Sequence, residues 1–301
     1  MYTNANPQGQ GLQVPTDRTT AGGEDRGDAR KWYRIEAVFW IIGMIVFIAS
    51  CIIIHFHPQP YPIDIAATQA VQGLHLWPWL ITALQFPSEL NNPIPSTVAI
   101  IAWFVGLLAV GLVRWISKLP AVLWFLSGIF LVLTVMTSAG LNVLIDEIVG
   151  RPRPDPKVYH FHLYTPLVPF PTYPSGHAEH DVAFYGFLLY LSFTKPVREW
   201  RYRWLLLPFQ LYAVYDILAI GYSRVLEGDH WLTDVLGGYL EGALDLFFFI
   251  FLYRLTTTWF ARYRAKKMAE KAAHRVRPYY SRRYYRRGTY ARRPRRRFRL
   301  F

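Results

Sequence analysis

The sequence predicts an all-α protein, a six-span transmembrane helical bundle, and two observations support that fold class. The chain has 301 residues, of which 52% are hydrophobic and 17% aromatic. Its apolar residues gather into blocks and do not alternate with polar residues as they would in half-buried strands. Several blocks approach the ~20 residues that a helix needs to cross a bilayer. Buried helices of a soluble bundle are the less favoured interpretation of the same blocks.

Six apolar blocks give the expected spans in chain order. The first, second, third and sixth are long enough to span, while the fourth is short and needs residues 178–180 as well. The fifth contains Pro208 and Asp216, which weaken its character as a span. The single cysteine, Cys51, excludes an intrachain disulfide. The six blocks are residues 37–56, 97–113, 121–145, 181–194, 204–222 and 235–253.

The polar segments at the two ends divide the chain into three parts. Residues 1–33 are polar and lack an apolar core, which predicts a disordered leader and no cleaved signal peptide. Residues 34–256 form the expected six-span catalytic membrane domain. Residues 257–301 form a basic tail rich in Arg and Tyr. The net charge of +13 belongs to this tail, because residues 261–301 hold 17 Lys and Arg against one Glu.

The distribution of Lys and Arg predicts which loops face the cytoplasm. Basic residues precede the first span and follow the second and fourth, whereas the loop 57–95 contains none. Because Lys and Arg accumulate in cytoplasmic loops, six spans with both termini inside satisfy this pattern. The loops 146–180 and 223–234 then lie at the outer face. Uncleaved spans without an organelle signal fit a bacterial inner membrane, and a eukaryotic membrane stays open.

The first of these outer loops contains residue types that suit an anion site. Arg151 and Arg153 alternate with prolines that stiffen the backbone, and guanidinium groups can bind phosphate oxygens in a bidentate manner. The stretch PSGH, residues 174–177, offers a hydroxyl, a freely turning backbone and a titratable imidazole. Taken alone, such arginines more often meet lipid headgroups, and PSGH is equally consistent with a helix N-cap.

The second outer loop carries the stretch SRVLEGDHWLTD, residues 223–234. If the residues from Trp231 onward are helical, His230 and Asp234 lie one turn apart on one face. A carboxylate there can hold one ring nitrogen and leave the other free as a nucleophile. An isolated His-Asp pair is more often structural. Three polar stretches in order on one side of the membrane, however, indicate a site that handles phosphate.

Together the stretches resemble the three-part signature of the type-2 phosphatidic acid phosphatase superfamily, which also includes vanadium haloperoxidases. The resemblance covers roughly residues 35–255, with an outer loop segment at residues 63–90 before the second span. The second and third parts match fully, including both internal spacings of the third. The matching residues are Arg153-Pro154, then Pro174-Ser175-Gly176-His177, then Ser223-Arg224 with His230 and Asp234.

The resemblance implies a mechanism through a phosphohistidine. His230 attacks phosphorus while Asp234 orients and stabilises its ring, and His177 protonates the leaving oxygen and then activates water. It also implies that no metal or other cofactor is required, because guanidinium groups supply the charge stabilisation. The groups expected to hold the phosphoryl oxygens are Arg153, Arg224, Ser175 and the Gly176 N–H.

One position departs from the family pattern, whose first motif opens with a Lys seven positions before its Arg. Counting back from Arg153 reaches Asp146, and counting back from Arg151 reaches a leucine. A carboxylate facing a phosphate dianion would repel it. We therefore expect Asp146 to turn away from the phosphate and pair with Arg151 or Arg153.

Acids within the spans and the basic tail predict further contacts. Asp216, Glu241 and Asp245 lie in expected spans, where interhelical hydrogen bonding is favoured over a proton route or a headgroup contact. The tail mixes Arg with Tyr, a composition that can also bind single-stranded nucleic acid. Anionic lipid headgroups are the favoured partner, at ~1 kcal/mol per basic residue near the surface, and nucleic acid is the less favoured one.

The sequence therefore predicts an integral membrane lipid phosphatase that acts at the outer face on a lipid phosphomonoester or pyrophosphate. Phosphatidate, phosphatidylglycerophosphate and polyprenyl pyrophosphate are candidate substrates among which the sequence does not choose. Two alternatives stay open: a lipid phosphotransferase using the same phosphohistidine, and a non-catalytic membrane lipid-binding protein. The missing motif Lys favours the second alternative, whereas the presence of His177, His230 and Asp234 argues against it.

Overall fold

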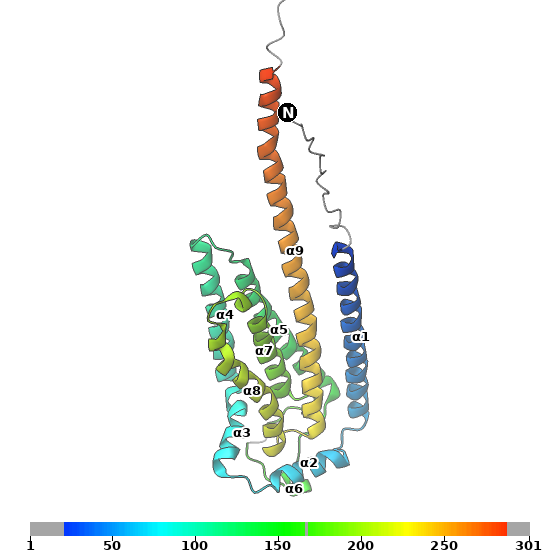
Figure 1. Cartoon of the computed structure of the whole chain (residues 1–301). Coiled ribbons are helices and arrows are strands. Elements are labelled where there is room, and N and C mark those ends of the chain that lie inside the picture. Colours follow the sequence, from blue (N-terminus) through cyan, green and yellow to red (C-terminus); the bar gives the residue numbers. More distant parts are fainter. Residues whose placement is uncertain (1–20, 166–167, 288–301) are drawn as a thin grey trace, which may run out of the picture.

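The computed structural model describes residues 21–165 and 168–287, and no strand occurs among them. Helices run mostly along one common direction, and their short connections gather at the two ends of the bundle (Figure 1). Two short 3₁₀ turns, Val197–Glu199 and Arg203–Leu206, connect α7 to α8. The α-helices are α1 (Ala21–Phe56), α2 (Pro62–Gln72), α3 (Pro78–Leu90), α4 (Pro93–Ile116), α5 (Val122–Val149), α6 (Pro156–Tyr159), α7 (Gly176–Phe193), α8 (Leu207–Leu226) and α9 (Leu232–Arg287).

Five helical segments of the described chain are long and apolar enough to cross a membrane, by length and composition. The fourth predicted span, α7, is not among them, although it has 18 residues and packs against α5, α8 and α9. Its first turns carry His177, Glu179 and Asp181, which dilute its apolar character. The prediction of six spans therefore stays a prediction for α7. The five segments are Lys31–Phe56, Pro93–Ile116, Val122–Val149, Arg203–Leu226 and Leu232–His274.

Local sequence explains where several helices begin and end. Pro62, Pro78 and Pro93 stand at the starts of α2, α3 and α4, where the N–H that proline lacks would have no helical partner. Gly150 ends α5 with a left-handed φ of 65°, which a residue with a side chain rarely adopts. The turn at Gly150 sends the chain directly into the loop that carries Arg151 and Arg153.

The side-chain distribution is that of a protein surrounded by an apolar medium. Leu131 on α5 and Phe187 on α7 are completely buried in the core of the bundle. Large apolar side chains also cover the outside, such as Phe39, Trp115 and Leu218, with relative exposures of 71%, 68% and 69%. An exposed apolar surface of this extent marks a membrane or interaction surface. The predicted all-α membrane fold is thus confirmed in its class.

Glycines let α9 lie unusually close to the start of α7. A Cβ added at Gly238 would lie 2.3 Å from the backbone oxygen of Ser175, and one added at Gly242 would lie 2.6 Å from that of Glu179. Small residues permit such backbone-to-backbone packing between membrane helices. This contact holds the stretch PSGH against the first turns of α9.

Two predicted boundaries differ from the observed elements. The helix α1 begins at Ala21, inside the segment 1–33 that was expected to be a disordered leader; residues 1–20 lie outside the described part. The helix α9 continues without a break past residue 256 to Arg287 and projects beyond the bundle (Figure 1). Residues 288–301 of the predicted tail lie outside the described part.

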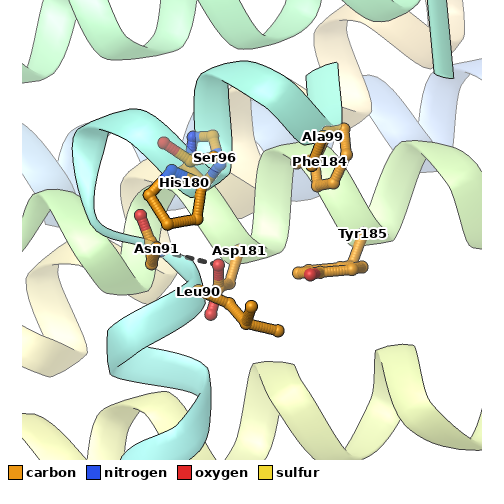
Figure 2. A pocket seen from close by; sticks show the side chains of 9 residues that line it. Leu90, Asn91, Ser96, Ala99, His180, Asp181, Phe184 and Tyr185 are labelled. Carbon is orange, nitrogen blue, oxygen red and sulfur yellow. Dashed lines mark hydrogen bonds between the residues drawn. The ribbon is translucent and has the colours of Figure 1, made fainter. Parts of the chain in front are cut away.

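The end of the bundle opposite this projection is closed by short helices. The loop before the second long apolar helix folds into α2 and α3, which pack on α8, and α6 lies at the same end (Figure 1). A small cavity lies between the start of α4 and the start of α7, close to this end (Figure 2).

Candidate active site

The three polar stretches of the sequence converge at this closed end. Arg153 follows α5, and His177 lies in the first turn of α7. Arg224 lies in the last turn of α8, and His230 precedes α9. Both histidines lie within electrostatic range of both arginines. Two imidazoles and two guanidinium groups are thus brought together from four separate elements.

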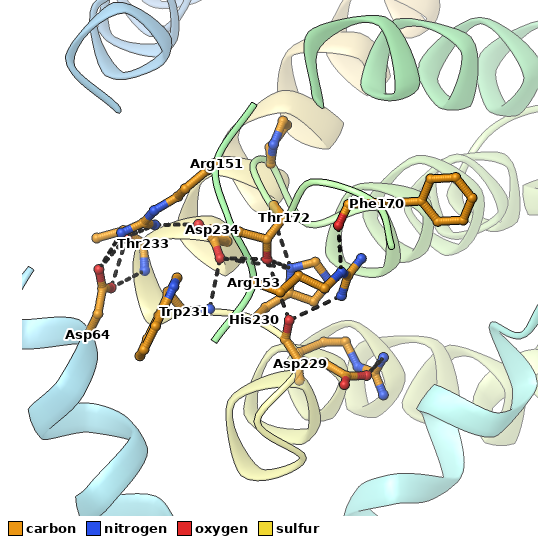
Figure 3. A network of polar contacts seen from close by, with 12 residues as sticks. Asp64, Arg151, Arg153, Phe170, Thr172, Asp229, His230, Trp231, Thr233 and Asp234 are labelled. Carbon is orange, nitrogen blue, oxygen red and sulfur yellow. Dashed lines mark hydrogen bonds and ion pairs between the residues drawn. The ribbon is translucent and has the colours of Figure 1, made fainter. Parts of the chain in front are cut away.

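A buried chain of charged groups supports the site from behind (Figure 3). One terminal nitrogen of Arg151 donates to Asp64 on α2 at 2.8 Å, and the other donates to Asp234 on α9. Burial disfavours the charge of Arg151, but Asp234 and Asp64 outweigh it and raise the pKa of its guanidinium. Thr233 also donates to Asp64 through its backbone N–H, at 2.9 Å. Arg151 is therefore a structural cation and is not free to bind phosphate.

The nucleophile candidate His230 is held by a residue outside the three motifs. Its Nδ1 lies 2.9 Å from both the hydroxyl and the backbone oxygen of Thr172, and the hydroxyl donates to Asp234 Oδ2 at 2.9 Å. The carboxylate of Asp234 itself is 3.9 Å from Nδ1, so it does not hold the ring directly as the sequence spacing suggested. Thr172 connects the two groups.

This arrangement leaves His230 with one free ring nitrogen. Because Nδ1 donates to the Thr172 carbonyl, Nε2 is the unprotonated nitrogen of a neutral ring. Burial, followed by the charges of Arg153 and Arg224, lowers the pKa of His230 well below its usual value. A ring that is neutral at physiological pH and carries a lone pair on Nε2 has the properties of a nucleophile.

The two arginines are fixed by carbonyl and carboxylate groups from neighbouring loops. Arg153 donates from Nε to the backbone oxygen of Phe170 at 3.0 Å and from one terminal nitrogen to that of Asp229 at 3.1 Å. Arg224 donates to Asp229 Oδ2 at 3.0 Å and also pairs with Glu227. Burial lowers the pKa of Arg153, and the charges of Asp229, Asp146 and Asp234 oppose this shift without cancelling it. The buried guanidinium of Arg224 and the half-buried one of Arg153, both held in a fixed orientation, are suited to receive an anion.

Ser175 and Gly176 add neutral donors to the same place. The Ser175 side chain is completely buried, and its hydroxyl has no hydrogen-bond partner within the described structure. Its backbone N–H donates to the backbone oxygen of Asp234 at 3.0 Å, which fixes the turn before α7. The helix starts at Gly176, where an added Cβ would lie 2.8 Å from Asn142 Oδ1. An unpartnered hydroxyl beside a helix N-terminus is the arrangement found in anion sites.

Asp146 does not behave as the sequence led us to expect. Its Oδ1 is buried without a partner, and among the described residues it forms no ion pair with Arg151 or Arg153. Arg151 is occupied by Asp64 and Asp234, whereas Arg153 interacts with Asp146 only at longer range. The expected pairing is therefore absent, because Asp64 and Asp234 already hold Arg151 and backbone oxygens of Phe170 and Asp229 hold Arg153.

The acids inside the bundle bond mainly to neighbouring helices. Asn142 on α5 donates to Glu241 on α9 at 2.7 Å, and Ser138 on α5 donates to Asp245 on α9 at 2.8 Å. Asp216 instead accepts from Tyr212 one turn earlier on its own helix, at 2.6 Å. Within the described part of the chain no group of three His, Cys, Asp or Glu side chains is placed to hold a metal ion.

The sequence did not identify Asp64 and Thr172 as residues that support the site, although the position of Asp64 gives an indication of its role. It lies in the loop 57–95, which has no Lys or Arg of its own, so a buried acid there needs a cation from elsewhere in the chain. Thr172 left no comparable signal. Its role depends on a contact between two loops that are distant in sequence.

Comparisons with known proteins agree with the motifs. A model of the PAP2 superfamily matches residues 127–261, the part of the chain that contains all three polar stretches. Phosphatidylglycerophosphatase B of Bacillus subtilis (strain 168) is 31% identical over 133 residues, which are 41% of this chain and 56% of that protein. The match thus spans little more than half the length of this relative.

A solved structure shows a similar fold. It is the crystal structure of a transmembrane PAP2 type phosphatidylglycerolphosphate phosphatase from Bacillus subtilis, with a TM-score of 0.54 and 22% sequence identity. The match covers 71% of this chain and 94% of that chain. At this level of identity the match concerns the arrangement of the helices.

Proposed function

We propose that the chain is an integral membrane lipid phosphatase of the type-2 phosphatidic acid phosphatase superfamily, whose family model matches residues 127–261. It hydrolyses a lipid phosphomonoester or pyrophosphate. The observation that carries the proposal is that His177 and His230 both lie within electrostatic range of Arg153 and Arg224. The hydroxyl of Ser175, at the start of the helix that carries His177, has no hydrogen-bond partner among the described residues.

The reaction proceeds in two displacements. In the first, Nε2 of His230 attacks phosphorus, the bond between phosphorus and the leaving oxygen breaks, and His177 gives its proton to that oxygen. In the second, His177 takes a proton from water, the water oxygen attacks the phosphohistidine, and His230 is released with inorganic phosphate. The hydrogen bond from Nδ1 to the Thr172 carbonyl supports this role, because it keeps the proton off Nε2.

Charge on the phosphoryl oxygens is balanced by protein groups. In this proposal Arg153, Arg224, the hydroxyl of Ser175 and the N–H of Gly176 bind these oxygens. Preorganised donors of this kind typically contribute several kcal/mol to the transition state. The proposed chemistry is complete with these groups and uses no metal.

The proposed location of the site is the outer face of the membrane. Support comes from the loop 57–95, which has no Lys or Arg and forms α2 and α3 beside the site, and from the exposed basic side chains of α9 at the other end. Arg262, Lys266 and Lys271 are examples of the latter. We propose that this end of α9 lies on anionic lipid headgroups.

Phosphate release by the purified protein in detergent tests the function. The assay uses phosphatidylglycerophosphate, phosphatidate and a polyprenyl pyrophosphate without any acceptor alcohol, so that release distinguishes hydrolysis from transfer. We expect release from at least one lipid, abolished by His230→Ala and unaffected by His162→Ala, an exposed histidine outside the site. Near-normal turnover of His230→Ala would exclude the phosphohistidine mechanism.

A further inference from the structure

The carboxylate of Glu227 lies at the centre of a buried set of hydrogen bonds beside Arg224, and the proposed reaction does not use it. Glu227 immediately follows α8 and is only 2% exposed. Its Oε1 accepts a hydrogen bond from Ser223 on α8 at 2.8 Å, and its Oε2 accepts one from Ser88 on α3 at 3.1 Å. A terminal nitrogen of Arg224 pairs with the same Oε2. The carboxylate thus joins two helices to one guanidinium group.

Both terminal nitrogens of Arg224 are held by neighbouring groups. One of them contacts Glu227 and donates to the hydroxyl of Ser88, and the other donates to Asp229 Oδ2 at 3.0 Å. Because the guanidinium group is planar, fixing two of its nitrogens fixes the direction of all five N–H groups. The side chain of Arg224 is buried, so water does not readily replace these partners. The orientation of Arg224 therefore depends on the groups that hold its two ends.

The remaining nitrogen of Arg224 has no partner. Its Nε is buried and makes no hydrogen bond to any described residue. A buried N–H of a charged group without an acceptor is costly, and native structures rarely keep one unless a ligand or a water molecule supplies the acceptor. His177 and His230 lie within electrostatic range of the same guanidinium group. The Nε–H is thus the donor that the fixed orientation leaves for a ligand of this site.

We propose that Glu227 is a positioning residue, which holds Arg224 so that its Nε–H donates to a phosphoryl oxygen of the substrate. The inference rests on the proposed phosphatase function. Glu227 does not touch the substrate and acts only through the guanidinium group. Ser88 makes α3 part of this arrangement, much as Asp64 connects α2 to Arg151. Each of the two short helices before α4 thus supports one arginine.

The charge of Glu227 by itself would have the opposite effect on phosphate binding. A carboxylate beside Arg224 offsets part of the positive charge and repels a phosphate dianion. If Glu227 acted only through its charge, its removal would strengthen phosphate binding. If it positions Arg224, its removal weakens phosphate binding, because the guanidinium group loses its fixed direction. The direction of the change therefore separates the two roles.

The test measures kcat, KM and the inhibition constant of inorganic phosphate, with phosphatidate and 4-nitrophenyl phosphate as substrates. Glu227→Ala should lower kcat/KM about 10- to 100-fold on both substrates, which share the phosphoryl group, and raise the phosphate inhibition constant about tenfold. Glu227→Gln keeps an oxygen that accepts from Arg224 and should recover most of the loss.

Glu89→Ala is the matched control for the loss of a carboxylate. Glu89 on α3 is exposed and lies within electrostatic range of Arg224, but it accepts a hydrogen bond from Asn92 instead. Because Glu89 does not hold the guanidinium group, Glu89→Ala should change each constant less than about twofold.

Thermal unfolding in detergent separates positioning from a loss of folding. Inorganic phosphate at about tenfold its wild-type inhibition constant should raise the Tm of the wild type by about 3–5 °C and that of Glu227→Ala by about 1 °C. If Glu227→Ala does not fold, Ser88→Ala takes its place, because it removes the hydroxyl that contacts both Glu227 and Arg224, and it should raise the inhibition constant about threefold.

The results that contradict the positioning role differ from those that contradict the phosphatase function. An equal rise in Tm in the wild type and Glu227→Ala, or an inhibition constant that is unchanged or lower in the variant, would overturn the role of Glu227. An unchanged inhibition constant in Ser88→Ala would do the same where that variant is used. If the wild type and Glu89→Ala release no phosphate from either substrate, the proposed function itself fails.

Discussion

The hydroxyl of Thr172 lies between the carboxylate of Asp234 and the imidazole of His230, at 2.9 Å from each. Thr172→Val keeps the volume and removes this hydroxyl, so Asp234 loses a donor and the ring loses a neighbour that restrains it. We expect kcat to fall about 10- to 100-fold with KM nearly unchanged, which corresponds to the ~1–3 kcal/mol of an unsatisfied buried group. Steady-state kinetics measures both constants.

Two further variants separate positioning by Thr172 from a general loss of structure. Thr172→Ser restores the hydroxyl and should recover most of kcat. Thr134→Val removes another completely buried hydroxyl, which donates only to the backbone oxygen of Phe130 in its own helix, and should leave kcat unchanged. A wild-type kcat in Thr172→Val would show that Asp234 orients His230 without the bridge.

Asp146 occupies the position where the family motif has a Lys. Its Oδ1 has no hydrogen-bond partner among the described residues, and its carboxylate lies within electrostatic range of Arg153. Removing a negative charge near a bound phosphate dianion is worth ~1 kcal/mol at 4 Å even in water-like surroundings. We therefore expect Asp146→Lys to lower KM about fivefold, measured by phosphate release. Glu147→Lys makes the same charge change at an exposed neighbour and should change KM little. An increase in KM in Asp146→Lys alone would show that Asp146 supports Arg153.

Among the individual residues, those of the motifs could be predicted from the sequence, whereas the residues that hold their side chains in place could not. Spacing alone indicated that His230 and Asp234 lie one helical turn apart on one face, at the start of the last helix. Spacing could not show that Thr172 fills the 3.9 Å between them, since that contact joins the loop before α7 to the loop before α9. For Arg151 and Arg153, the sequence did not distinguish the structural cation from the site cation.

Among the helices, the short helix α2 is connected by buried ion pairs to the end of the bundle that carries the site. Asp64 on α2 is completely buried and pairs with Arg151, which in turn holds Asp234 on α9. Asp64→Ala leaves part of a buried charge uncompensated, so we expect a loss of ~3–5 kcal/mol in the free energy of unfolding and a much lower Tm. Thermal unfolding in detergent measures the change.

An exposed ion pair provides the comparison for Asp64→Ala. Glu36 pairs with Arg254 at 2.8 Å, but its side chain is 43% exposed, so Glu36→Ala should cost ~1 kcal/mol or less. Equal changes in Tm for the two variants would mean that α2 contributes nothing special to the site end of the bundle.

The helices themselves divide into those that hydropathy could predict and those that it could not. The long apolar blocks correspond to α1, α4, α5, α8 and α9, because length and apolarity are properties of the local sequence. The short helix α7 is surrounded by α5, α8 and α9, and this protein environment supplies partners for polar groups such as Glu179. Because neighbouring helices and not the local sequence account for the burial of α7, its apolar block alone is too short to predict a membrane span.

For the whole molecule, the connections place the site and the projecting part of α9 at opposite ends (Figure 1). If the tail is cytoplasmic, as predicted, the site therefore lies at the outer face, and the two predictions must hold or fail together. Both depend on α7 crossing the full thickness of the membrane. With 18 residues it spans about 27 Å, close to the ~30 Å of the hydrocarbon core.

Labelling of single cysteines tests this orientation and the sixth span together. Tyr164 precedes α7 and Trp200 follows it, and both side chains are accessible, with exposures of 49% and 44%. In a Cys51→Ser background, Tyr164→Cys should react with an impermeant thiol reagent added outside intact cells, whereas Trp200→Cys should react only after the membrane is opened. Reaction of both from the outside would mean that α7 does not span. Reaction of Trp200→Cys alone from the outside would invert the whole molecule and place the phosphatase site in the cytoplasm.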